Sequence, residues 1–125
     1  MSHIGKYTCR IRNANMTLAK ATLQILEKTK RITWTENGAI RDYYGNTQRH
    51  SLVVNIGRGI AISTENGELA FITDEYGQQR EVREFQQTFE QYYRAMAATA
   101  ALRQMGYSVS MTEQDGELRI GANQL

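Results

Sequence analysis

Two groups of arginines and tyrosines have the chemistry to bind an anionic ligand. The first group comprises Arg41, Tyr43, Tyr44, Arg49 and His50, and the second comprises Tyr93 and Arg94 on a long predicted helix. Guanidinium groups hold phosphates through paired hydrogen bonds, and aromatic rings stack on nucleobases. One interpretation is a small pocket that captures an anionic nucleotide or cyclic nucleotide signal. In that pocket Arg41, Arg49 and Arg94 would hold phosphates, and Tyr43 or Tyr93 would stack on the base.

The period of the surrounding elements restricts which of these side chains can share a pocket. Side chains alternate along a strand, so Arg41 and Tyr43 are predicted to point to one face and Tyr44 to the other. On the helix, Tyr93 and Arg94 are predicted to turn toward solvent, away from the apolar stripe. The alternative interpretation is an ordinary sheet with strand aromatics and solvated arginines.

Catalytic motifs are scarce. The chain has two histidines, His3 and His50, and a single cysteine, Cys9, which we expect to be a small core residue. No nucleophile elbow, zinc-binding pair or phosphate loop is present. A weak hydrolase that uses His50 or an aspartate is the least supported hypothesis. We therefore expect a protein that is not an enzyme and that has no metal site and no cofactor.

Length, charge and cysteine content narrow the class of protein. The chain has 125 residues, which predicts a single domain over residues 1–125. The formal net charge of +2 makes nucleic acid an unfavourable partner and gives no reason to expect a membrane surface. A lone cysteine, with no signal-peptide pattern and no long apolar run, predicts a cytoplasmic protein.

Hydrophobic periodicity predicts two helices among short strands. A medium helix is expected over residues 15–29, with Asn15 at its N-cap, and a long one from residue 81 or 82 to residue 105. Strands are expected at residues 6–12, 31–35, 39–44, 51–56, 59–64, 68–73, 107–111 and 118–120. Hairpin turns are expected at residues 37–38, 66–67 and 115–116. The fold class is α+β, with a mostly antiparallel sheet of about six to eight short strands against both helices.

A short motif occurs twice in the middle of the chain. Thr35-Glu36-Asn37-Gly38 recurs at residues 64–67, and each copy leads to an Asp-x-Tyr-Gly sequence, at residues 42–45 and 74–77. Repeated turn chemistry explains the motif more simply than a duplication does.

The long helix contains a segment, residues 95–102, that is small and apolar nearly all round. We expect this segment to be covered twice, by the protein's own sheet and by a second copy of the chain, which predicts a homodimer. A fully internal helix is the alternative.

The order of motifs resembles a family of small proteins named for hypothetical chloroplast reading frame thirty-five. The matching segments are residues 1–3, 40–45, 52–54, 68–74, 89–95, 105–109 and 115–120. The chain departs from the family pattern at residues 75–77 and 123–125, where members have bulky aromatic residues. The resemblance implies a bacterial, plastid or phage origin and no assigned activity. Family members are often encoded beside an ATPase of the AAA type, so the resemblance also implies a binding or adaptor role with such a partner. This role ranks first among the hypotheses, ahead of nucleotide capture.

Overall fold

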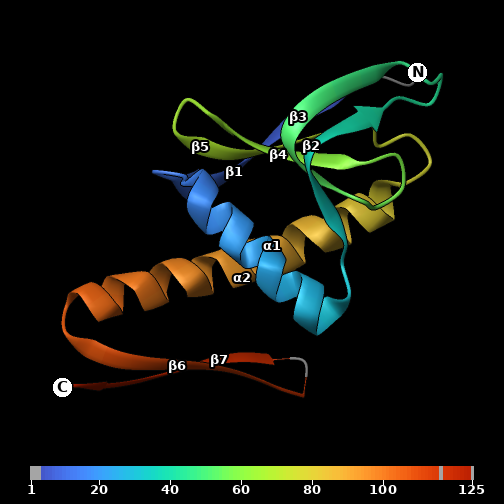
Figure 1. Ribbon diagram of the computed structural model, residues 1–125. Helices are drawn as coiled ribbons and strands as arrows, with labels where there is room; N and C mark the ends of the chain where they lie inside the picture. Colours follow the sequence, from blue (N-terminus) through green and yellow to red (C-terminus); the bar gives the residue numbers. More distant parts are fainter. Residues whose placement is uncertain (1–3, 116, 125) are drawn as a thin grey trace.

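The computed structural model describes residues 4–115 and 117–124. It contains two helices and seven strands in these residues, which confirms the expected α+β class (Figure 1). The elements are β1 (Gly5–Arg12), α1 (Met16–Lys30), β2 (Trp34–Arg41), β3 (Thr47–Val54), β4 (Ile60–Glu65), β5 (Glu68–Thr73), α2 (Gln79–Gln104), β6 (Tyr107–Gln114) and β7 (Glu117–Gln124). The Met1–His3 segment, which contributed to the family resemblance, and Gly116 of the expected last hairpin lie outside the described residues.

Five strands form an antiparallel sheet in the order β1-β5-β4-β3-β2. The chain crosses from one edge of this sheet to the other through α1, because β1 and β2 are the two edge strands. Both helices cover the same face of the sheet (Figure 1). Apolar side chains of β3, β4 and β5 meet those of α1 and α2 there; they include Leu23, Leu26, Leu52, Val54, Ile60, Ile62, Phe71, Phe85 and Phe89. A smaller cluster of Ile40, Val53, Ala61 and Ile72 buries the opposite face.

The first helix begins and ends with the expected chemistry. The Asn15 side chain accepts hydrogen bonds from the backbone N–H groups of Thr17 and Leu18, at 2.8 and 3.2 Å. These bonds satisfy donors that have no partner within the helix. Arg31 closes the helix in the left-handed conformation, at φ 56°. The observed helix extends the expected range by one residue at its C-terminal end.

The prediction of a hairpin turn at residues 37–38 is wrong. Asn37 and Gly38 lie inside β2, which pairs with β3 in one continuous register from Trp34–Val54 to Arg41–Thr47. The turn follows at residues 42–46, where the Asp42 carboxylate accepts the Asn46 backbone N–H at 2.9 Å. The two strands expected at residues 31–35 and 39–44 are therefore one strand, and β3 begins four residues earlier than expected. The turn at residues 66–67 is confirmed, because it joins β4 to β5.

The long helix α2 carries the expected apolar stripe, but the stripe is wider than expected. Val82, Phe85, Phe89 and Tyr92 are buried, and so is Tyr93, which stacks on Phe89 with ring centres 6.0 Å apart. The prediction that Tyr93 faces solvent is wrong, because α1 crosses α2 at this point and covers it.

The C-terminal hairpin of β6 and β7 lies on the side of α2 that faces away from the sheet (Figure 1). The Glu113 carboxylate fixes it to both helices by accepting a hydrogen bond from Tyr92 Oη at 2.7 Å and forming a salt bridge with Lys30 at 3.0 Å. Thr99 is the buried residue of segment 95–102, whereas Ala98, for example, is exposed. The alternative prediction, that this segment lies fully inside the protein, is therefore wrong.

Neither helix in the described part of the chain is long and apolar enough to cross a bilayer.

Candidate functional site

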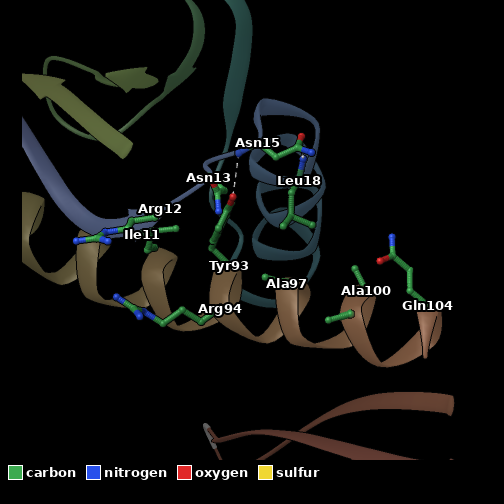
Figure 2. Close-up of a pocket in the computed structure, with 11 residues that line it drawn as sticks. Ile11, Arg12, Asn13, Asn15, Leu18, Tyr93, Arg94, Ala97, Ala100 and Gln104 are labelled. Carbon is green, nitrogen blue, oxygen red and sulfur yellow. Dashed lines mark hydrogen bonds between the residues drawn. The ribbon is translucent and has the colours of Figure 1, made fainter. Parts of the chain in front are cut away.

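An open pocket lies between the C-terminal half of α2 and the junction of β1 with α1 (Figure 2). Its volume is about 510 Å³, which is within the usual range for small-ligand sites of ~300–1,000 Å³. The residues that line it are Ile11, Arg12, Asn13, Asn15, Leu18, Tyr93, Arg94, Ala97, Ala100, Ala101 and Gln104. We call it the anion pocket.

Small apolar side chains form the floor of the anion pocket. Ala97 and Ala100 point from α2 toward α1, and Leu18 points down from α1 toward them (Figure 2). Alanine side chains are short, so a flat ligand can approach the helix closely along this stretch. This floor belongs to segment 95–102, which we expected to lie against a second copy of the chain.

Two guanidinium groups extend toward one end of the pocket. Arg12 comes from the end of β1 and Arg94 from α2, and the Gln104 amide lies at the opposite end (Figure 2). Among the side chains that the structure describes, no carboxylate lies within 4 Å of either guanidinium. The pocket therefore has a positive end, an apolar middle and a neutral polar end.

A partly buried hydrogen bond holds the two walls of the pocket together. Tyr93 Oη accepts the backbone N–H of Asn15 at 3.0 Å, which joins the start of α1 to the middle of α2. Asn13 takes the left-handed conformation, at φ 54°, and turns the chain from β1 into this cap. Tyr93 is therefore a supporting residue of the pocket and is not available to stack on a base from the solvent side.

A second group of side chains lies where three loops meet. Tyr43 and Tyr44 come from the turn between β2 and β3, and Tyr76 comes from the loop between β5 and α2. The ring centre of Tyr43 lies 4.8 Å from that of Tyr76 and 5.5 Å from that of Tyr44. We call these three residues the tyrosine cluster. The two Asp-x-Tyr-Gly motifs, far apart in the sequence, are thus in direct contact.

Asp74 connects the loops beneath the tyrosine cluster. It is only 2% exposed, and its carboxylate accepts the backbone N–H groups of Tyr43 at 2.8 Å and Tyr76 at 3.0 Å. Arg58, from the third loop, lies 3.8 Å from this carboxylate and donates to the Asp74 and Tyr76 carbonyl oxygens. Its guanidinium also lies over the Tyr43 ring, 5.8 Å from the centre.

Gln78 completes the connection to the third loop. Its amide donates to the Asp74 carbonyl at 2.7 Å and accepts the Arg58 N–H at 3.2 Å. A Cβ atom on Gly57 would come within 1.8 Å of the Gln78 Oε1 atom, and φ at Gly57 is +56°. Only glycine fits at that position without moving the loop.

The structure separates the residues that the sequence grouped as ligand-binding. Arg94 and Tyr93 belong to the anion pocket beside β1, whereas Tyr43 and Tyr44 belong to the tyrosine cluster on the β2–β3 turn. Arg41 is exposed at the end of β2 and is not among the residues that line the anion pocket.

The two remaining expected residues lie along β3. The Arg49 guanidinium donates to the Asn37 carbonyl at 2.7 Å, so it supports the unusual conformation inside β2. His50 is half-buried; burial, and secondarily the charge of Lys6, lowers the pKa of His50 below its usual range.

Sequence reasoning missed several residues that build the two sites. Arg12 is the last residue of the first predicted strand and precedes the turn residue Asn13, and this position only weakly indicates a binding role. The sequence identified Asp74 and Tyr76 only as members of a repeated turn motif. It identified Arg58 only as part of a Gly-Arg-Gly loop. Their roles depend on contacts between distant segments.

Cys9 is half-buried against the core, as expected of a small core residue, and burial raises the pKa of its thiol to about 12. Residues 4–115 and 117–124 contain no group of three His, Cys, Asp or Glu side chains placed to hold a metal ion.

Comparison of the chain with protein-family models, with curated proteins and with solved structures finds no match.

Proposed function

We propose that the protein is a non-catalytic binding protein that captures a small anionic ligand in the anion pocket. The observation that carries this proposal is the pair of guanidinium groups, Arg12 and Arg94, at one end of a pocket of about 510 Å³. Because no described carboxylate lies within salt-bridge distance of either group, both remain free to bind an incoming anion.

The arrangement along the pocket favours a nucleotide over a simple anion. A phosphate at the arginine end would form charge-assisted, paired hydrogen bonds. A flat base would then lie over the alanine floor, and the Gln104 amide could hydrogen bond to its edge. Linear and cyclic nucleotides both have this sequence of anionic and planar groups.

We also propose that the protein belongs to the reading-frame thirty-five family, has a bacterial or phage origin and is located in the cytoplasm. A dimer and an adaptor role beside an AAA-type ATPase are the second candidate function. The exposed tyrosine cluster favours this candidate, because exposed aromatic patches are typical of protein-binding surfaces.

Thermal unfolding against a panel of linear and cyclic nucleotides tests ligand capture. A ligand at about 100 times its Kd adds roughly 2.7 kcal/mol to the free energy of unfolding, which raises Tm by several degrees. We expect Arg12→Ala and Arg94→Ala to remove the shift. Arg83→Ala is the matched control, since Arg83 is an exposed arginine of α2 outside the pocket.

A second variant tests whether binding needs the open volume of the pocket as well as its positive charge. Ala101→Leu fills the pocket from an exposed position of α2 and keeps both guanidinium groups. We expect it to fold normally and to lose the nucleotide shift. A shift that persists in Arg94→Ala and Ala101→Leu, or no shift with any nucleotide, would refute ligand capture in this pocket.

A further inference from the structure

The tyrosine cluster is an exposed aromatic surface that the anion pocket does not use. Tyr43, Tyr44 and Tyr76 are 56%, 70% and 48% exposed. Neighbouring rings meet edge to face, with planes at 87° between Tyr43 and Tyr44 and at 69° between Tyr43 and Tyr76. The surface therefore presents ring faces in different directions, at steep angles to one another. Tyrosine is enriched at the positions that contribute most to protein binding.

The backbone beneath the cluster is fixed before any partner arrives. The buried Asp74 carboxylate accepts an N–H from each of the two turns, and Arg58 and Gln78 connect the third loop to them. Loops that are already ordered lose little conformational entropy on binding. The bonds described above hold the turns together, and the three tyrosines remain 48–70% exposed to solvent.

The charges around the cluster argue against a polyanionic partner. Arg41 adds one exposed positive charge, and Asp42 and Glu75 add two negative charges beside the rings. The Arg58 guanidinium lies next to the Asp74 carboxylate, so this pair adds no net charge. Nucleic acid binding depends on an excess of positive charge, which this surface lacks. A neutral partner that packs against aromatic faces and accepts hydrogen bonds from tyrosine hydroxyls fits better.

We propose that the tyrosine cluster docks a proline-rich segment of a partner protein. A polyproline II helix has carbonyl groups with no internal hydrogen bonds, and its pyrrolidine rings pack on aromatic side chains. Its conformation is already extended, so two ordered surfaces meet at low entropic cost. The 125 residues of the sequence contain no proline, so these residues do not supply the segment themselves.

Titration of the isotope-labelled protein with a decaproline peptide tests this proposal by the movement of backbone amide signals. We expect saturable shifts at residues 42–46, 57–58 and 75–78, with little change elsewhere. Tyr44→Ala and Tyr76→Ala should each weaken binding about tenfold, the usual cost of losing an aromatic anchor. Tyr107→Ala is the matched control, because Tyr107 lies on β6, away from the cluster.

Several outcomes would overturn the proposal. One is the absence of saturable shifts in these loops, and another is equal affinity of decaproline for the parent protein and for a folded Tyr44→Ala variant. Tyr44 is the most exposed of the three rings, so this variant retains the packing beneath the cluster. Tighter binding of oligothymidylate than of decaproline would replace the peptide with single-stranded nucleic acid. Arg94→Ala should leave decaproline binding unchanged, which separates this result from the fate of the anion pocket.

Discussion

Replacement of Asp74 by alanine tests how the loops beneath the tyrosine cluster are held together. The substitution removes the acceptor of two backbone N–H groups, from Tyr43 and Tyr76, and leaves the Arg58 guanidinium without its carboxylate. Hydrogen bonds to a charged group contribute about 1.5–3 kcal/mol each, and breaking a buried ion pair by removing one partner costs about 3–5 kcal/mol. These effects overlap, so we expect Asp74→Ala to lower the free energy of unfolding by about 3–5 kcal/mol.

Urea unfolding measures this loss directly. A domain of this size has a total stability of about 5–15 kcal/mol, so the variant should remain folded in water with a clearly lower midpoint. Asp42→Ala is the matched control, because Asp42 occupies the equivalent position in the first Asp-x-Tyr-Gly motif but, in the part of the chain that the structure describes, binds only its own turn. We expect a smaller loss there. Equal losses in the two variants, or a loss below about 1 kcal/mol in Asp74→Ala, would refute the assigned role of Asp74.

Three further predictions concern the supporting contacts. Tyr93→Phe leaves the partly buried Asn15 backbone N–H without its acceptor, and we expect urea unfolding to show a loss of about 0.5–1.5 kcal/mol, whereas an unchanged midpoint would contradict this. The hydrogen bond from Tyr92 lowers the pKa of Glu113, so its stabilising effect is complete above the ordinary carboxyl pKa and is lost as pH falls through the lowered value. In acid unfolding, the stability of Glu113→Gln should therefore fall less steeply over this pH range than that of the parent protein. The same pH profile in both proteins would count against the contact. Burial raises the pKa of Cys9 to about 12, so we expect iodoacetamide to modify it far more slowly in the folded protein than in urea at pH 8.

Local chemistry was enough to predict the helices and the class of the fold. The Asn15 cap, the apolar period of α2 and the turn at residues 66–67 are all determined by neighbours within a few residues. The hairpin expected at residues 37–38 failed because two turn signals competed. The Asp42 carboxylate accepts N–H groups of Tyr44 and Asn46 and so favours the turn at residues 42–46. Arg49 then supports Asn37 within the strand, and this contact is invisible until the strands are paired.

The misplacement of Tyr93 has a different physical cause. A helical period shows which side of α2 is apolar, but it does not show how many elements cover the helix at each turn. Phe89 packs on the sheet residue Phe71, whereas Tyr93, one turn further on, binds the N-terminus of α1. The width of the buried stripe thus depends on where α1 crosses, and that depends on the connection from β1. For the same reason the sequence could not bring Arg12 and Arg94 together.

The repeated Asp-x-Tyr-Gly motif shows why identical local signals can have different roles. In both copies the aspartate accepts the backbone N–H two residues later, which is the bond that defines this turn. Among the described residues, Asp42 adds contacts only within its own turn, at Asn46. Asp74 is buried and also accepts an N–H from the other copy, so it connects the two turns. The motif therefore predicts a turn at each site, and tertiary packing determines which aspartate supports the tyrosine cluster. A partner that recognises the cluster would consequently depend on Asp74 without contacting it, whereas a ligand of the anion pocket would not.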